Sequence, residues 1–127
     1  ASGGGGVSDE DRVIVHEALQ ALDQGWLGGS TKFIASDTQH SIADLMAYEE
    51  IAQATMMSDS LDDMPTAYPN VHDWVRRMQE LPFHEPVHVA PQMIGSLASL
   101  ECDDLPKKLG AATKAGMKAL QDAQQEK

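Results

Sequence analysis

The fold is decided by residues 41–57, which read SIADLMAYEEIAQATMM. Ser41 and Asp44 open the stretch in the pattern of a capping box, in which the serine accepts from a first-turn N–H and the acid reaches back to the serine N–H. The 42–57 segment has 11 apolar residues among 16, and at 100° per residue they surround nearly the whole cylinder. A helix that is apolar on all sides is typical of a buried position. We therefore predict a central core helix over 42–57 that other helices surround.

Helical patterns flank this segment on both sides. Ser8 can cap a helix over 8–24, whose acidic first turn suits the positive end of the helix dipole. A second amphipathic stripe consists of Val71, Trp74, Val75, Met78 and Leu81, and Pro82 ends it. The next helix is predicted over about 90–100. Proline fits only in the first turn of a helix, so Pro86 and Pro91 do not allow a regular helix to begin much earlier.

The rest of the chain adds a last helix and loops but no strand. The final helix is predicted over about 106–124, and the acidic stretch 59–66 is predicted to be a loop. No period-2 alternation and no internal repeat is present in the sequence. The sequence therefore predicts an all-α bundle of about five helices. Its parts are a flexible Gly-rich N-terminus over 1–7, a helical domain over 8–100 and an amphipathic helix or tail over 101–127.

The charge distribution excludes one class of partner. The net charge is −11, which argues against nucleic acid, because phosphate binding needs clustered cations. Residues 1–104 hold 18 acids and four bases, whereas residues 105–127 hold two acids and five lysines. The basic tail is interpreted first as an ordinary solvated helix face, and second as a surface that lies against the acidic body or an acidic neighbour.

Two further features bear on where the chain works. No run approaches the roughly 18 apolar residues of a membrane-spanning helix. The single Cys102 excludes an internal disulfide and suits a soluble, reducing compartment. The cytosol fits, as does an organelle matrix or stroma if the Gly-rich start is the remnant of a targeting peptide. A linker or an artificial extension explains that start equally well.

Three landmarks together resemble the C-terminal domain of glutathione S-transferases. Phe33-Ile34 followed by Ser41-Ile42-Ala43-Asp44-Leu45 is similar to the family signature, although Ser36 stands where the family usually has glycine. The stretch 68–78, with Trp74, is similar to the family's next helix, and 83–88 resembles the segment that follows in theta-like members. The resemblance spans about 10–98. It implies a structural capping role for Ser41 and Asp44, with core landmarks at Phe33, Ile34, Leu45 and Trp74.

The sequence contains only weak signals for a catalytic or metal-binding site. Residues 84–88, HEPVH, match the H-E-x-x-H zinc pattern, but Pro86 interrupts the helix that the pattern needs and no third histidine follows. We interpret the segment as an exposed loop that leads into a helix. His16, His40 and His72 are interpreted as surface residues, and the acidic neighbours of Cys102 favour an inert thiol. We therefore predict no catalytic residue, no cofactor site and no metal site.

The methionines admit two interpretations. Met46, Met56, Met57, Met64, Met78 and Met93 fit either core filling or an adaptable binding groove, and core filling is favoured.

The resemblance implies a function without catalysis in this chain. In the family, the thioredoxin-like half activates glutathione, and neither that half nor the first long helix of the C-terminal domain is recognised here. The faces of helices 8–24 and 42–57 that this helix would cover are therefore expected to be exposed, and exposed apolar surface marks an interface. We expect a protein-interaction or scaffold module that binds a protein partner or forms a homo-oligomer. The alternatives are a transferase fragment that supplies the hydrophobic-substrate side, and a carrier of small hydrophobic ligands with a closed cavity.

Overall fold

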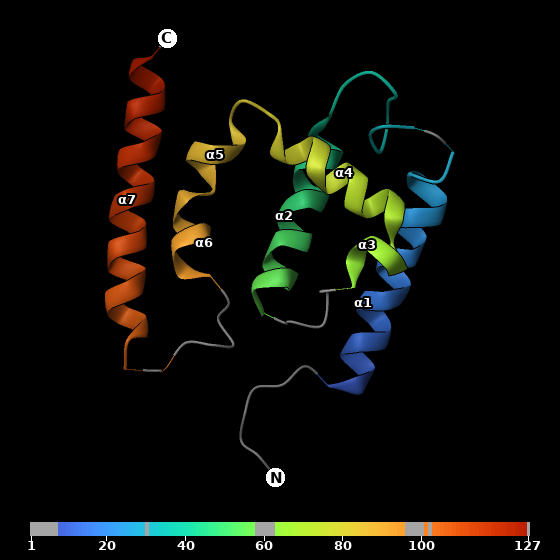
Figure 1. Cartoon of the computed structure of the whole chain (residues 1–127), viewed down its shortest axis with the longest axis horizontal. Helices are drawn as coiled ribbons and strands as arrows, with labels where there is room; N and C mark the ends of the chain where they lie inside the picture. The colour runs from blue at the N-terminus through green and yellow to red at the C-terminus, as the bar shows by residue number, and fades with distance from the viewer. Residues whose placement is uncertain (1–7, 30, 58–62, 96–100, 102, 127) are drawn as a thin grey trace.

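A computed structural model describes residues 8–29, 31–57, 63–95, 101 and 103–126. Over these residues all regular secondary structure is helical and no strand is present, so the predicted all-α class is confirmed (Figure 1). The described residues contain seven α-helices and one π-helix, in place of the five helices predicted. The segment predicted over 8–24 divides into two elements, two short helices over 84–94 replace the one predicted over 90–100, and one short helix forms within the predicted 59–66 loop. The elements are α1 (Asp9–Ala21), η1 (Leu22–Trp26), α2 (Ile42–Met57), α3 (Met64–Ala67), α4 (Pro69–Gln79), α5 (His84–Val87), α6 (Val89–Ile94) and α7 (Leu105–Gln125).

The first helix begins as predicted and ends differently. Ser8 and Asp11 form a complete capping box, with the Asp11 N–H donating to the Ser8 hydroxyl at 3.1 Å. The helix then widens into the π-helix η1, where the Leu27 N–H donates to the Leu22 carbonyl at 3.0 Å. A π turn adds one residue to the backbone repeat and rotates the following side chains. Asp23 is buried in this turn.

The core lies between α1, α2, α3 and α4. Its buried residues are Leu19, Leu27, Tyr48, Met64, Tyr68, Val71, Trp74 and Met78. The predicted stripe on α4 supplies three of them, and Trp74 is completely buried. The 59–66 segment is not wholly a loop, since α3 begins at Met64, which packs into this core. Residues 58–62 lie outside the described part of the chain.

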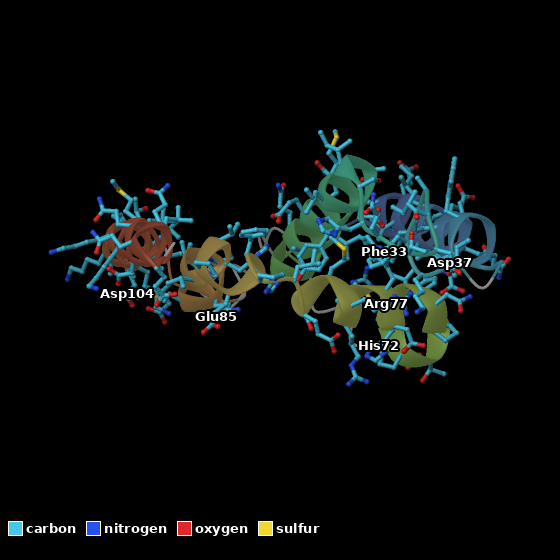
Figure 2. The ribbon with its side chains drawn as sticks, turned by 90° about the horizontal axis from the view of Figure 1, so that it is seen from above. Phe33, Asp37, His72, Arg77, Glu85 and Asp104 are labelled. Carbon is cyan, nitrogen blue, oxygen red and sulfur yellow. The ribbon has the colours of Figure 1, made fainter. Side chains whose placement is uncertain are left out.

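The loop before α2 is held against α4. The Arg77 Nε donates to the Lys32 carbonyl at 3.0 Å, and Figure 2 shows Arg77 and Phe33 in the same part of the molecule. Phe33 and Ile34 are half-buried and pack on the core cluster. These two residues therefore lie at the edge of the core.

Two short helices replace the single helix predicted over 90–100. Pro86 and Pro91 are each the third residue of their own helix, α5 and α6. A proline in a first turn removes no intrahelical hydrogen bond, so each proline is compatible with a new helix start. The regular structure therefore begins at His84, earlier than predicted. Gly95 ends α6 with a φ of 67°, and residues 96–100 are outside the described range.

The last helix, α7, lies at the edge of the molecule. Figure 1 shows α7 at one edge and α1 at the other, with α2 and α4 between them. From above, α7 is connected to the rest through α5 and α6, with Glu85 on α5 between them (Figure 2). The buried residues of α7 are Ala112 and Gly116. A Cβ added at Gly116 would lie 3.1 Å from the Ala90 Cβ, so this contact depends on small residues.

The prediction that α2 is surrounded on all sides is wrong. Ile42, Leu45 and Met46 are 75%, 46% and 66% exposed, so Leu45 is not a core landmark. Tyr48 and Asp44 on the opposite side are buried. The apolar composition of α2 is uniform around the helix, and composition alone does not say which side another helix covers.

Candidate functional site

Asp44 is the polar centre of the core. It is completely buried, and its two carboxylate oxygens accept hydrogen bonds from three other residues. Oδ1 accepts from the Ile34 N–H at 2.9 Å and from the Trp74 Nε1–H at 2.9 Å. Oδ2 accepts from the Ser41 N–H at 2.9 Å, as the capping-box pattern predicts. The Ser41 hydroxyl donates to the same oxygen at 3.1 Å, a donor role in place of the predicted acceptor role.

These hydrogen bonds set the charge state of Asp44. Burial alone would raise the pKa of this carboxyl group, since it disfavours the charged form. The hydrogen bonds donated to the carboxylate outweigh burial and hold its pKa below the usual value. An ionised Asp44 therefore joins the 33–34 loop, the start of α2 and α4 in one network. This is a structural role, as expected for Ser41 and Asp44.

A second buried aspartate was not identifiable from the sequence. The Asp23 Oδ1 accepts from the Val71 N–H at 2.9 Å, and Val71 is the third residue of α4. The first N–H groups of a helix have no partner within the helix, so Asp23 caps α4 from a distant part of the chain. The Asn70 side chain donates to the Asp23 carbonyl at 3.0 Å. Burial raises the pKa of Tyr68, and the nearby Asp23 charge raises it further.

The H-E-x-x-H segment forms a cluster of rings against α2. The rings of His84 and His88 stack at 3.9 Å between centroids, with 15° between their planes. The Tyr48 hydroxyl and the His84 Nε2 are 2.5 Å apart, and the His88 Nε2 is 2.9 Å from Glu49 Oε1. His88 is buried, so the interpretation of 84–88 as an exposed loop is wrong for this residue. Because each histidine binds a side chain of α2, the cluster joins α5 to α2.

The electrostatics of the cluster favour neutral His84. Burial lowers the pKa of His84, the neighbouring His88 lowers it further, and Glu49 opposes both. Burial raises the pKa of Tyr48, and the Glu49 charge adds to this effect. Both Nε2 atoms are engaged with α2 side chains. Within the described ranges, no three side chains of His, Cys, Asp or Glu are placed to hold a metal ion.

The remaining candidate residues are spread over the molecule. His16 contacts the Tyr68 hydroxyl, His40 packs edge-on against Phe33, and His72 lies 3.6 Å from its neighbour Asp73. The prediction of a surface position is confirmed for His16, which is exposed although it contacts a core tyrosine, whereas His40 and His72 are half-buried. Cys102 and the side chains of Met56 and Met57 lie outside the described residues.

The structure divides the other methionines into two groups. Met64 and Met78 are in the core, as favoured, whereas Met46 and Met93 are exposed.

The exposed apolar side chains form the remaining candidate site. On α1, Val13 and Ile14 are exposed, and on α2 the trio Ile42, Leu45 and Met46 is exposed, as expected for both helices. A shallow depression on α1 and η1 is lined by Glu17, Gln20, Ala21, Gln24, Gly25 and Trp26. It is open to solvent, so it does not have the closed shape that a carrier of small ligands needs. On α2, the exposed apolar residues Ile42, Leu45 and Met46 lie together on one side of the helix.

Two searches, for a membrane-spanning helix and for similar proteins, gave negative results. Among the described residues, no helix combines the length and the hydrophobicity that crossing a bilayer requires. Comparisons with protein-family models, with curated proteins and with solved structures find no match to this chain.

Proposed function

We propose that this chain is a non-catalytic protein-interaction module, in which the outer face of α2 is the docking surface. The outer face consists of Ile42, Leu45 and Met46, which are spaced i, i+3 and i+4 and therefore lie on one side of the helix. Their exposure is the observation that carries the proposal. Fully covering such a side chain contributes about 1.5–3 kcal/mol each, which is enough for three residues to dominate a small interface.

The proposal includes a helical arrangement like that of the C-terminal domain of glutathione S-transferases. It is supported by the Asp44 carboxylate, which binds the Ile34 N–H and the Trp74 indole at 2.9 Å each. Three separate landmarks of the resemblance are thus joined by one side chain. In this proposal, the outer face of α2 is the surface that an additional helix covers in the complete domain, and a partner protein takes that place.

The test is site-specific photocrosslinking. A photoreactive amino acid replaces Met46 on the outer face, and in a matched control it replaces Thr66, which is exposed on α3. We expect a protein adduct from position 46 that is absent from position 66 when the chain is irradiated in an extract of its native cells. Equal labelling at the two positions would contradict a specific docking surface. Retention of the chain on immobilised glutathione would instead support the transferase-fragment alternative.

A further inference from the structure

The outward side of α7 carries apolar and basic residues together. Leu109, Met117 and Leu120 are 42–59% exposed, although α7 is packed against α5 and α6. Lys107, Lys108 and Lys114 are exposed beside them and make no ion pair with any described residue. The buried residues on the side of α7 that faces the rest of the chain are Ala112 and Gly116, and Lys114 lies on the opposite side of the helix.

The order of residues on α7 mirrors the order of a row on α2 that includes Ile42 and Met46 of the outer face and continues to Glu50. On α2, Ile42, Met46 and Glu50 follow one another at four-residue intervals, and all three are exposed. On α7, Leu120, Met117 and Lys114 follow at three-residue intervals in the opposite chain direction, and all three are exposed. Both rows run apolar, apolar, charged, with an acid ending one and a base ending the other. Each row spans about 10–12 Å, because neighbouring positions on a helix face lie about 5–6 Å apart.

Rows of these two spacings are able to pack together. A ridge of four-residue steps against a ridge of three-residue steps gives a helix crossing of about 20°, the geometry of most helical bundles. With the helices antiparallel, Leu120 and Met117 meet Ile42 and Met46, and Lys114 meets Glu50. Glu50, like Lys114, has no ion-pair partner within the described part of the chain.

From this match we propose that the partner of the outer face is a second copy of the chain, with α7 of one copy docked on α2 of the other. The inference rests on the proposed function and identifies its partner. Net charge alone opposes self-association, since each copy carries −11. The segregation of charge removes that obstacle, because residues 105–127 carry five lysines and the rest of the chain carries 18 of the 20 acids. The contact is reciprocal, because α7 of each copy docks on α2 of the other. A two-fold axis therefore closes the assembly at a dimer.

A charge-swap experiment tests the pairing in trans. The molar mass of the 13.7 kDa chain is measured by sedimentation over a range of concentrations, and we expect a dimer. Lys114→Glu and Glu50→Lys each place like charges at both contacts and should weaken the dimer about tenfold or more. A mixture of the two variants should form heterodimers with near-normal affinity, because each contact then joins opposite charges.

The control changes another exposed glutamate, Glu80, in place of Glu50. Glu80→Lys carries the same change in charge at the end of α4 and should not restore association with Lys114→Glu. All three positions are exposed, and circular dichroism verifies that each variant is folded. A chain that stays monomeric at every concentration, or a mixture that shows no recovery, would overturn the inference. If position 46 still crosslinks to another protein in that case, the proposed function stands and only the identity of the partner is wrong.

Discussion

The two ends of the molecule are held together in different ways. Around α4, eight buried side chains form the core, and the carboxylates of Asp44 and Asp23 each bind an N–H of another element. At α7, the buried contacts are made by Ala112 and Gly116, and Leu109, Met117 and Leu120 are exposed. The first end has a dense core with directional hydrogen bonds, whereas the second has a shallow contact between small residues.

The comparison shows which part of the chain is held in a single arrangement and which part leaves apolar side chains exposed for binding. Buried hydrogen bonds restrict a core to one arrangement, since any other arrangement leaves a polar group without a partner. A contact of alanine and glycine lets two helix backbones approach closely but covers little apolar area. The end around α4 therefore fixes the position of the outer face of α2. At the α7 end, the large apolar side chains are left exposed and can contact another molecule.

The largest expected effect is the loss of the Asp44 carboxylate. Asp44→Ala leaves the Trp74 indole and the Ile34 N–H buried without an acceptor, and each such group costs about 1–3 kcal/mol. We expect the free energy of unfolding to fall by about 3–5 kcal/mol, measured by urea denaturation. The exposed control Asp103→Asn should change it by less than about 0.5 kcal/mol. A loss below about 1 kcal/mol for Asp44→Ala would show that the network does not hold this end together.

The next effect compares two helix caps. Asp23→Ala removes a buried acceptor from the start of α4 and should lower the free energy of unfolding by about 2 kcal/mol. Ser8→Ala removes the exposed cap of α1 and should lower it by about 1 kcal/mol at most. Equal losses for the two variants, in the same denaturation measurement, would mean that burial of the Asp23 cap adds nothing.

Two glycines of α7 test the small-residue contact within one helix. Gly116→Val forces side-chain atoms against Ala90, where even a Cβ would be at 3.1 Å, and should cost about 1–3 kcal/mol. Gly110→Ala meets no atom within 4 Å and should stabilise the helix by about 0.5–1 kcal/mol. Amide hydrogen exchange of α7 reports both changes: we expect faster exchange for Gly116→Val and slower exchange for Gly110→Ala, with α4 unaffected. Faster exchange throughout α4 in Gly116→Val would contradict the separation of the two ends.

The sequence was sufficient for the features that depend on local spacing. The stripe on α4, the bond from Ser41 to Asp44 and the limits of α7 to within one residue all follow from periodicity and capping patterns. In each case the residues that decide the structure are neighbours along one helix, so a short window of sequence contains the whole signal.

Other features depend on contacts that no local window contains. Asp23 and Val71 are 48 positions apart, and a π turn has no simple sequence signal, so the cap on α4 could not be foreseen. The burial of His88 depends on Glu49 and Tyr48 from another helix. The exposure of Leu45 depends on which sides of α2 the other helices cover. These are properties of packing between helices, and a uniformly apolar helix gives no preferred side.

The smallest expected effect is the pH response of the junction between α5 and α2. The pKa of His84 is lowered in the folded state, chiefly by burial, so its contribution to stability is complete above the unfolded pKa of about 6.5 and is lost as the pH falls toward the folded pKa. Tyr48, Glu49 and His88 surround this ring, and His84→Gln removes its titration while leaving all three in place. We expect the normal chain to lose stability between pH 7.5 and 5.5 in urea denaturation, and the variant to lose less. The stability of both chains should then fall again below about pH 4, because Asp44, whose pKa is also lowered in the folded state, becomes protonated there. An equal loss in the two chains between pH 7.5 and 5.5 would assign the response to groups other than His84. The second fall acts on the Asp44 network and the first on the junction that carries α7, so pH separates the two ends of the molecule.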